Sequence, residues 1–336
     1  MIRKMTSKIS MAEPEKLLMS VRNLKKHYPI GSSFFKSNNE YVKAVDGIDL
    51  DLYAGKTLGL VGESGCGKST FGKCIIRAIE PSAGEIKVYL DKEYSIREMR
   101  KGEFRAFRKN LQMIFQDPNS SLDPRMTIRD VISEPIKANS NISKIQVEEK
   151  VKYLMDIVGL NPNQLYRYPH AFSGGQQQRI CIARALALNP KFIVFDEAVS
   201  ALDVSVQAQV LNLLKKLQAE FNLSYLFISH DLSVVRYICD YILVLYLGKV
   251  VEAAPTKELF DKPTHPYTQA LLSAIPREHP NQEKKVHKII GETPSPINIP
   301  KGCPFHTRCP YKQKKCLERF PEKITLKNNH YHHCIL

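Results

Sequence analysis

A short glycine-rich run, Gly62-Glu63-Ser64-Gly65-Cys66-Gly67-Lys68-Ser69, matches the pattern G-x-x-x-x-G-K-[ST] at every fixed position, and Thr70 follows it. Glycines allow backbone N–H groups to turn toward phosphate oxygens, and a helix N-terminus adds partial positive charge. In such a loop Lys68 reaches the β- and γ-phosphates, and the Ser69 hydroxyl is a ligand for Mg²⁺. The run therefore predicts binding of a nucleoside triphosphate together with Mg²⁺.

The flanking residues support this interpretation of the glycine-rich run. The short apolar run 57–61 precedes it and predicts a buried strand, and the proline-free run 71–79 predicts a helix. Strand, loop and helix in this order are the context that the pattern requires. The alternative, a glycine-rich turn with an accidental lysine, does not account for that context.

Acidic and amide side chains follow two other predicted strands. Gln116 ends the apolar run 111–116, and its amide oxygen is suited to binding Mg²⁺ and positioning water. Asp196 and Glu197 end the run 192–197; we expect Asp196 to hold Mg²⁺ and Glu197 to orient and polarise water. A lone glutamine or a pair of acids at a strand end is more often a solvated surface group, so the combination carries the argument.

Three further motifs complete the set. Phe172-Ser173-Gly174-Gly175-Gln176 opens a predicted helix, which Ser173 can cap and whose glycines expose N–H groups to an anion. Asp203 ends Ser200-Ala201-Leu202-Asp203, and His230 ends the next predicted strand. A lone histidine is usually structural, but this one falls at the edge of the sheet where open α/β sheets bind ligands.

An α/β fold is expected to position these residues. The predicted helix between the apolar runs 191–195 and 225–229 makes a β-α-β unit, which requires parallel strands. The other predicted strands are 17–24, at a sheet edge, 42–53, 57–61, 85–90 and 111–116. Helices are predicted at 71–79, 95–109 and 205–221 and within 122–170, where Val147, Val151, Leu154 and Val158 form one apolar stripe.

In this order the motifs resemble those of the nucleotide-binding subunits of ATP-binding cassette (ABC) transporters, over residues 17–275. The resemblance implies a P-loop ATPase fold with a mixed or parallel core sheet and catalysis by Glu197, His230 and Gln116. It also implies a head-to-tail pair of subunits, with ATP between the Walker A run of one and the signature sequence of the other. The matched segments are Walker A (62–69), the Q-loop (Gln116), the signature sequence (172–176), Walker B with its glutamate (192–197), the D-loop (200–203), the switch histidine (His230) and the adenine-stacking aromatic (Tyr28).

Two segments narrow the resemblance. Residues 264–272 and 196–209 are similar to those of ATPases of dipeptide, oligopeptide and nickel importers, most of all to the "F" subunit that works beside a "D" subunit. The usual Pro-Thr after the Walker B acids is Ala198-Val199 here, outside the expected ligand set, so activity should survive. The resemblance implies two transmembrane permease subunits, an extracytoplasmic binding protein and a peripheral position on the cytoplasmic side of the cell membrane.

Four cysteines, Cys303, Cys309, Cys316 and Cys334, stand near the C-terminus with the spacing C-x5-C-x6-C-x17-C. With no secretory signal in the sequence we expect a reducing compartment, which disfavours disulfides. Zinc prefers C-x2–4-C pairs, whereas a [4Fe–4S] cluster accepts four thiolates at varied spacing. An iron–sulfur cluster is the favoured interpretation, and zinc or unligated thiols stay open. The stretch 303–310 also resembles the C-terminal cluster segment of peptide-importer ATPases.

The composition limits the remaining classes. The chain has 336 residues and a formal net charge of +15, and its sequence has no apolar run long enough to cross a membrane. The charge admits nucleic acid, an anionic membrane or a solvated basic face. No nucleic-acid partner is expected, because the chain has one cassette and no long insertion between Lys68 and Ser173. The rival classes are a soluble nucleic-acid ATPase, a metal importer and a metal-regulated switch protein.

The expected division is a basic tail (1–16), an ATPase domain (17–279) with a helical subdomain (about 117–175), and a cysteine-bearing extension (280–336) with a linker at 280–302.

Overall fold

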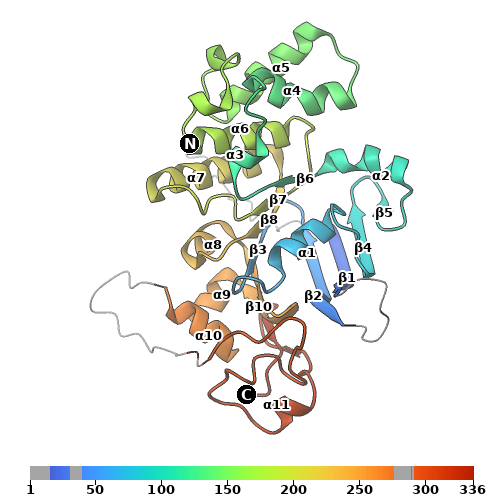
Figure 1. The fold of residues 1–336 in the computed structure, drawn as a ribbon, viewed down its shortest axis with the longest axis vertical. Coiled ribbons are helices and arrows are strands. Elements are labelled where there is room, and N and C mark those ends of the chain that lie inside the picture. Colours follow the sequence, from blue (N-terminus) through green and yellow to red (C-terminus); the bar gives the residue numbers. More distant parts are fainter. Residues whose placement is uncertain (1–15, 31–39, 276–288, 290) are drawn as a thin grey trace, which may run out of the picture.

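The computed structural model describes residues 16–30, 40–275, 289 and 291–336. These residues form a four-stranded sheet, in the order β2-β1-β4-β5, and an eight-stranded sheet, in the order β11-β12-β10-β9-β3-β8-β7-β6. Figure 1 shows helices α3 to α6 at one end of the molecule and the C-terminal segment at the other. Residues 1–15 of the predicted basic tail, the Gly/Ser/Asn-rich stretch 31–39, and residues 280–288 and 290 of the predicted linker lie outside the described residues.

The four-stranded sheet is antiparallel. Its strands are β1 (Leu17–Pro29), β2 (Tyr41–Tyr53), β4 (Ala83–Tyr89) and β5 (Glu93–Ser95). The prediction that the first strand lies at a sheet edge is wrong, because β1 pairs with β2 on one side and β4 on the other. The predicted helix at 95–109 is shorter than expected, since residues 93–95 pair with β4 and the helix, α2, begins only at Lys101 and ends at Phe107.

The eight-stranded sheet is mixed. Strands β6, β7, β8, β3 and β9 pair in parallel, and β10, β12 and β11 add antiparallel pairs. Every residue of β3, β7 and β8 is buried, as expected for parallel strands covered on both faces. The predicted β-α-β unit is confirmed around α7 (Val204–Phe221). The bounds are β3 (Thr57–Val61), β6 (Leu111–Ile114), β7 (Phe192–Asp196), β8 (Ser224–Ile228), β9 (Tyr241–Tyr246), β10 (Lys249–Pro255), β11 (Ile324–Thr325) and β12 (Tyr331–His332).

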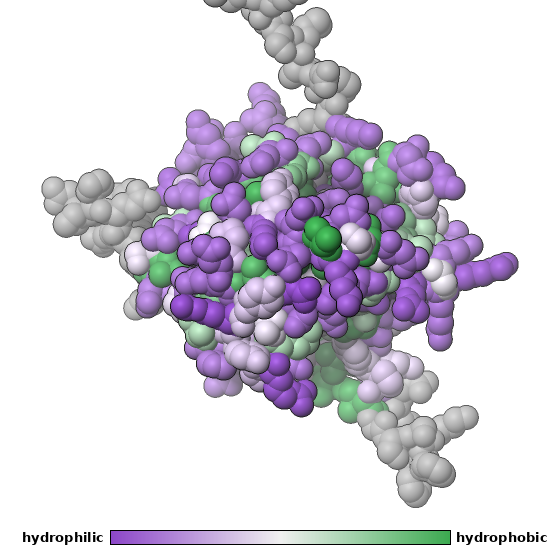
Figure 2. All heavy atoms as spheres, turned by 90° about the horizontal axis from the view of Figure 1, so that it is seen from above, coloured by the Kyte–Doolittle hydropathy of each residue, from purple (hydrophilic) through white to green (hydrophobic). Residues whose placement is uncertain are grey.

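The helical end of the molecule contains α3 (Pro118–Ser121), α4 (Ile128–Asn139), α5 (Lys144–Ile157) and α6 (Gly174–Leu186). The apolar stripe predicted in this region is confirmed, since Val147, Val151, Leu154 and Val158 are all buried in one core cluster. Figure 2 looks onto this end and shows a largely hydrophilic surface with small separate hydrophobic spots. The described exposed apolar side chains of this end, Ile145 and Tyr153 among them, are thus scattered, as on an ordinary protein surface.

The remaining α-helices are short. Helix α1 follows β3 and begins at Lys68, earlier than the predicted start at residue 71. Glycine at its N-cap, in a left-handed conformation, lets the helix start inside the glycine-rich run. The bounds are α1 (Lys68–Ile75), α8 (Leu232–Ile238), α9 (Thr256–Asp261), α10 (Pro266–Ser273) and α11 (Lys315–Glu318).

The C-terminal segment is joined to the larger sheet. Strand β12 pairs with β10 through Glu252 and Ala253, and β11 pairs with β12. The Glu252 side chain is fully buried, and its carboxylate accepts hydrogen bonds from the N–H and hydroxyl of Thr264 (both 2.8 Å), the N–H of His265 (2.9 Å) and Nε2 of His330 (2.8 Å). One buried acid therefore connects β10, the α9–α10 connection and the tail.

Replacing this acid should destabilise the fold. Glu252→Ala leaves several buried donors without an acceptor, and we expect the free energy of unfolding to fall by about 3 kcal/mol. Urea unfolding of the full-length chain measures this loss. Glu258→Ala is the matched control: the Glu258 side chain accepts an exposed hydrogen bond from Asn328 of the tail, so its replacement should cost about 0.5 kcal/mol. Equal losses for the two variants would contradict the prediction.

Candidate active site

The glycine-rich run forms a loop between β3 and α1 that packs against β2. Gly62, Gly65 and Gly67 have φ angles of 151°, 77° and 105°, in the region that disfavours other residues. A Cβ atom on Gly67 would lie 1.9 Å from the carbonyl oxygen of Ala44 in β2. The loop conformation therefore requires glycine at this position both for the backbone and for space.

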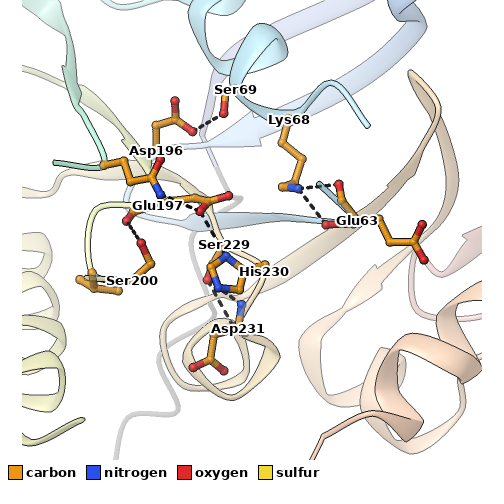
Figure 3. A network of polar contacts seen from close by, with 12 residues as sticks. Glu63, Lys68, Ser69, Asp196, Glu197, Ser200, Ser229, His230 and Asp231 are labelled. Atoms are coloured by element: carbon orange, nitrogen blue, oxygen red, sulfur yellow. Dashed lines mark hydrogen bonds and ion pairs between the residues drawn. The ribbon is translucent and has the colours of Figure 1, made fainter. Parts of the chain in front are cut away.

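Lys68 is held inside this loop. Its side chain is buried, and Nζ donates hydrogen bonds to the carbonyl oxygens of Gly62 (2.8 Å) and Glu63 (2.9 Å), as Figure 3 shows. The backbone of the loop thus fixes the ammonium group beside the N-terminus of α1. Two sources of positive potential, the lysine and the helix terminus, lie in one place, as an anion site requires.

Ser69 and Asp196 join the loop to the end of β7. The Ser69 hydroxyl donates a hydrogen bond of 2.7 Å to Oδ1 of Asp196. Burial raises the pKa of the Asp196 carboxyl, although this hydrogen bond opposes the shift. A hydroxyl and a carboxylate oxygen in contact are the kind of hard ligands that Mg²⁺ takes, so these two residues fit the predicted metal position.

Glu197 brings together the three residues predicted to be catalytic. Gln116, which follows β6, donates from Nε2 to Oε2 of Glu197 (3.3 Å), and Nδ1 of His230, which follows β8, lies 3.2 Å from the same oxygen. The three residues follow neighbouring parallel strands, whose carboxyl ends meet at one edge of the sheet. The structure therefore assembles this part of the predicted site.

The backbone at Glu197 is unusual. Its φ angle is 51°, in the left-handed region that non-glycine residues rarely adopt. The N–H of Glu197 donates to the Ile228 carbonyl (3.0 Å), and its own carbonyl accepts from the N–H (3.1 Å) and hydroxyl (2.8 Å) of Ser200. These bonds hold the chain in the turn that directs the carboxylate toward His230, as seen in Figure 3.

The signature residues, and Asp203 of the D-loop, lie apart from this assembly. Ser173 and Gln176 form a capping box at the start of α6, and the Gly175 position packs against Val206 of α7. Ser173, Gly174, Gln176 and Asp203 are exposed. Within the described ranges, no hydrogen bond or ion pair joins residues 173–176 or 203 to the glycine-rich loop. The chain thus presents these residues on its surface, outside the assembled half of the predicted site.

Tyr28 lies on β1 opposite Val42 of β2, the strand whose Ala44 touches the glycine-rich loop. Nζ of Lys26 lies 4.9 Å from the Tyr28 ring centroid. The ring is half-buried rather than enclosed in the core. Its place on the neighbouring strand agrees with a position near the loop, and its contact with adenine stays a prediction.

The four C-terminal cysteines lie close together at the end of the molecule opposite the helices. Cys303, Cys316 and Cys334 are buried and Cys309 is half-buried, and the Cys303 N–H donates to the Cys316 carbonyl (2.8 Å). Burial, with a contribution from the other three thiols, raises the pKa of the Cys303 thiol to about 12. Among the residues that the structure describes, however, no three Cys, His, Asp or Glu side chains are grouped tightly enough to hold a metal ion.

Sequence reasoning missed three contacts to Glu63. Its carboxylate accepts hydrogen bonds from Arg308 (2.7 Å) and Thr293 (2.6 Å), and its N–H donates to the Tyr267 hydroxyl (2.9 Å). These partners are more than 200 positions away along the chain, and no local pattern links them to the loop. The sequence feature that could have indicated these contacts is the arginine that lies between Cys303 and Cys309.

Comparison with known proteins agrees with this geometry. One family model, described as ABC transporter, matches residues 45–200, and another, described as oligopeptide/dipeptide transporter, C-terminal region, matches residues 251–316. The chain is 51% identical to the oligopeptide transport ATP-binding protein AppF of Bacillus subtilis (strain 168), over 97% of this chain and 99% of that protein. It is 50% identical to the oligopeptide transport ATP-binding protein OppF of Escherichia coli (strain K12), over 93% and 94%.

The chain belongs to the oligopeptide/dipeptide family of ABC transporter ATP-binding proteins. A di/tripeptide transport ATP-binding protein, DppF of Pseudomonas aeruginosa (strain UCBPP-PA14), is 46% identical over 91% of this chain and 93% of its own length. The family resemblance inferred from the motifs is thereby confirmed. Members of this family bind and hydrolyse ATP.

Solved structures confirm the ABC ATPase fold. The dimeric post-hydrolysis structure of the ATP-binding cassette MJ0796 bound to ADP and Pi has a TM-score of 0.62 at 28% identity, and the alignment covers 71% of this chain and 99% of that one. The structure of cbiO1 from Clostridium perfringens, described as part of the ABC transporter complex cbiONQ, has a TM-score of 0.63 at 24% identity and covers 74% and 92%. Its identity is low enough that it supports the fold alone.

Proposed function

We propose that this chain is the ATP-hydrolysing subunit that energises uptake of peptides through an ABC importer. The observation that carries the proposal is the meeting of Gln116, Glu197 and His230 on one carboxylate oxygen beside the Lys68 loop. That arrangement would supply an anion site, two oxygen ligands for Mg²⁺ and a carboxylate that can orient an attacking water. Peptide cargo is supported by the names of the relatives, and nickel, carried by importers of the same class, is the alternative.

Phosphoryl transfer to water needs positioning and charge stabilisation more than covalent chemistry. Lys68 and the N–H groups at the start of α1 bind the phosphates. Ser69 and Asp196 are the proposed Mg²⁺ ligands, with Gln116 as a third. Bound there, Mg²⁺ would supply positive charge to offset that of the phosphates. Glu197 orients water for in-line attack, and His230 holds the carboxylate and contacts the γ-phosphate in the closed arrangement.

The exposed signature residues lead us to propose that a second ABC ATPase subunit completes the site. Ser173, Gly174 and Gln176 of each subunit would close over the ATP bound by the other, with Asp203 beside the contact. Val204, which follows Asp203, is 81% exposed and supports the proposal as an apolar group on the same face. The second subunit is either a related "D"-type chain or a copy of this one.

The remaining partners are two transmembrane permease subunits and an extracytoplasmic substrate-binding protein. No described helix has the length and apolar character that crossing a membrane would need. We place the subunit at the cytoplasmic side of the cell membrane, held there by the permeases, with no nucleic-acid partner. We also propose the division into an ATPase domain (17–279) with a helical subdomain (about 117–175), and an extension (280–336).

Purification of the complex from its own cells tests this function. Hydrophobic permease subunits should co-purify with the chain, and the reconstituted complex should take up labelled peptide only when ATP is supplied. Uptake of nickel in place of peptide would assign the alternative cargo. Co-purification with RNA or DNA and without permeases would contradict the proposal.

We further propose that Cys303, Cys309, Cys316 and Cys334 bind a [4Fe–4S] cluster. The thiols of Cys309, Cys316 and Cys334 contribute to raising the pKa of the Cys303 thiol, so the four lie near one another, and Gly302 and prolines stand beside the cysteines in this short tail. These features support thiolate coordination of a soft metal centre. Closure of the thiols around a cluster would require them to approach further than they do here, since none of the described residues forms a ready metal group.

This proposal predicts a coloured protein. Full-length chain purified without oxygen should show the broad visible absorption of an iron–sulfur centre and contain iron and acid-labile sulfide in equal amounts. Cys316→Ser should lose both the colour and the iron, because thiolates hold these clusters. Cys181→Ser, at a buried cysteine of α6 away from the tail, is the control and should stay coloured. A colourless protein with one zinc per chain would end the iron–sulfur proposal.

A further inference from the structure

The cysteine-bearing tail reaches the phosphate-binding loop through one arginine. Nη1 of Arg308 donates a hydrogen bond of 2.7 Å to Oε2 of Glu63, the acid within the glycine-rich run. The hydroxyl of Thr293 donates to the same oxygen (2.6 Å) and accepts from Arg308 (3.2 Å). Two tail residues thus bind one carboxylate of the loop.

The contact between Arg308 and Glu63 is shielded from water, and neighbouring aromatic side chains hold Arg308 in place. The Arg308 side chain is only 9% exposed, and that of Glu63 24%. Arg308 also donates to the Tyr246 hydroxyl (3.4 Å), and the Tyr246 ring packs against the rings of Tyr267 and Phe305. An ion pair held this way is screened less than a surface pair and keeps its geometry better.

Glu63 in turn holds Lys68, the phosphate-binding lysine. Its N–H donates to the Tyr267 hydroxyl of α10 (2.9 Å), and its carbonyl accepts from Nζ of Lys68 (2.9 Å). The side chain, N–H and carbonyl of Glu63 are therefore all engaged. Movement of Arg308 would change the position of the residue that orients Lys68.

The negative charge of Glu63 gives its contact with Arg308 a second effect on the loop. Burial alone would raise the pKa of the Glu63 carboxyl, but hydrogen bonds from Arg308 and Thr293 outweigh it and lower the pKa, so the group is ionised at neutral pH. Figure 3 shows this carboxylate directed away from the Lys68 side chain. Released from Arg308, the same carboxylate would be an uncompensated negative charge in a loop that binds a triphosphate.

We propose that Arg308 is a positioning residue of the ATP site, through which the C-terminal extension sets the affinity of the Walker A loop for ATP. The extension then completes the nucleotide site in addition to pairing with strand β10 of the larger sheet. This inference rests on ATP binding by residues 62–70, but it assigns a role to the tail that such binding does not require. Disturbance of the tail around its cysteines would, through Arg308, weaken nucleotide binding.

Equilibrium binding of ATP to the full-length chain tests the inference. Arg308→Gln should raise the dissociation constant for ATP about tenfold, equivalent to about 1.4 kcal/mol. In the assembled transporter the same variant should raise the KM for ATP while kcat stays within twofold, because Glu197 and His230 are untouched. Arg308→Lys, which keeps the charge without the planar fork, should recover part of the affinity. Arg319→Gln is the matched control, since Arg319 lies in the same tail but is 78% exposed.

A double-mutant cycle between Arg308 and Glu63 shows whether Arg308 positions Glu63 or only supports the fold of the tail. If Arg308 acts by holding Glu63, then Arg308→Gln in a Glu63→Gln background should change ATP affinity by less than twofold. If the arginine only supports the tail, its loss should cost the same in both backgrounds, and that result would overturn the inference. Thr293→Val removes the other donor to Glu63 from a more exposed position; it should weaken ATP binding about threefold, and it provides the test should Arg308→Gln not fold. Failure of the wild-type chain to bind ATP would instead contradict the site itself.

Discussion

Glu197→Gln is expected to leave ATP binding within twofold of wild type and to lower turnover in the assembled transporter by about 10²–10⁴-fold. Binding depends on Lys68, Ser69 and the N-terminus of α1, none of which this change touches. Turnover depends on a carboxylate that polarises water, and an amide cannot accept the proton. The variant should also keep its hydrogen bond with Gln116, so the loss is chemical rather than structural. Equilibrium ATP binding and phosphate release measure the two quantities.

The control for this variant is Glu220→Gln, at an exposed acid near the end of α7. It makes the same chemical change away from the site, and both quantities should stay at the wild-type level. If the partner subunit keeps an active site of its own, the corresponding glutamate must be replaced there as well before the residual rate is interpreted. Turnover near the wild-type rate with both acids replaced would remove Glu197 from its assigned role.

Gly67→Ala is expected to abolish ATP binding, with a dissociation constant raised at least about 100-fold. A Cβ at this position would lie 1.9 Å from the Ala44 carbonyl oxygen, and a φ of 105° adds backbone strain. The loop must therefore move away from β2, and the N–H groups at the start of α1 move with it. Loss of a few hydrogen bonds to a charged ligand, at about 1.5–3 kcal/mol each, accounts for an effect of this size. Calorimetric titration with ATP measures it.

Gly65→Ala is the matched comparison within the same loop. Gly65 also has a positive φ, 77°, but a Cβ there meets nothing within 4 Å. Gly65→Ala should therefore introduce backbone strain without a steric clash, which lowers the free energy of unfolding by about 1–2 kcal/mol. The variant should retain measurable ATP binding. If the two alanine variants bound ATP equally well, the packing of the loop against β2 would not be what fixes its conformation.

Much of the site follows from local sequence. Residues Gln116, Glu197 and His230 each follow a short apolar strand, and parallel strands bring their carboxyl ends to one edge, so their meeting was predictable. The stripe of Val147 and Val151 indicated the helical region in the same way, because burial of one helix face leaves a period in the sequence. These predictions succeed because each structural feature depends on residues that are close together in the sequence.

The failures involve contacts between distant segments. The strand at 17–24 was expected at an edge because its sequence gives no sign of β4, which pairs with it from some 65 positions away. The Arg308–Glu63 ion pair joins residues 245 positions apart, and an arginine between two cysteines looks the same whether it faces solvent or the loop. Local propensity and hydrophobic period carry no information about such pairs, which tertiary packing alone decides.

The order of strands in the larger sheet has a consequence for synthesis of the chain. Strand β10 is completed on its outer side by Tyr331 and His332 of β12, and the His333 N–H donates to the Val251 carbonyl (2.8 Å). Until the ribosome has released these residues, that row of backbone groups faces water. Unpaired strand borders of this kind recruit strands from other molecules. Neighbouring nascent chains on one messenger are therefore prone to aggregate until residues 331–333 have emerged, and a stop codon before residue 331 would make that exposure permanent.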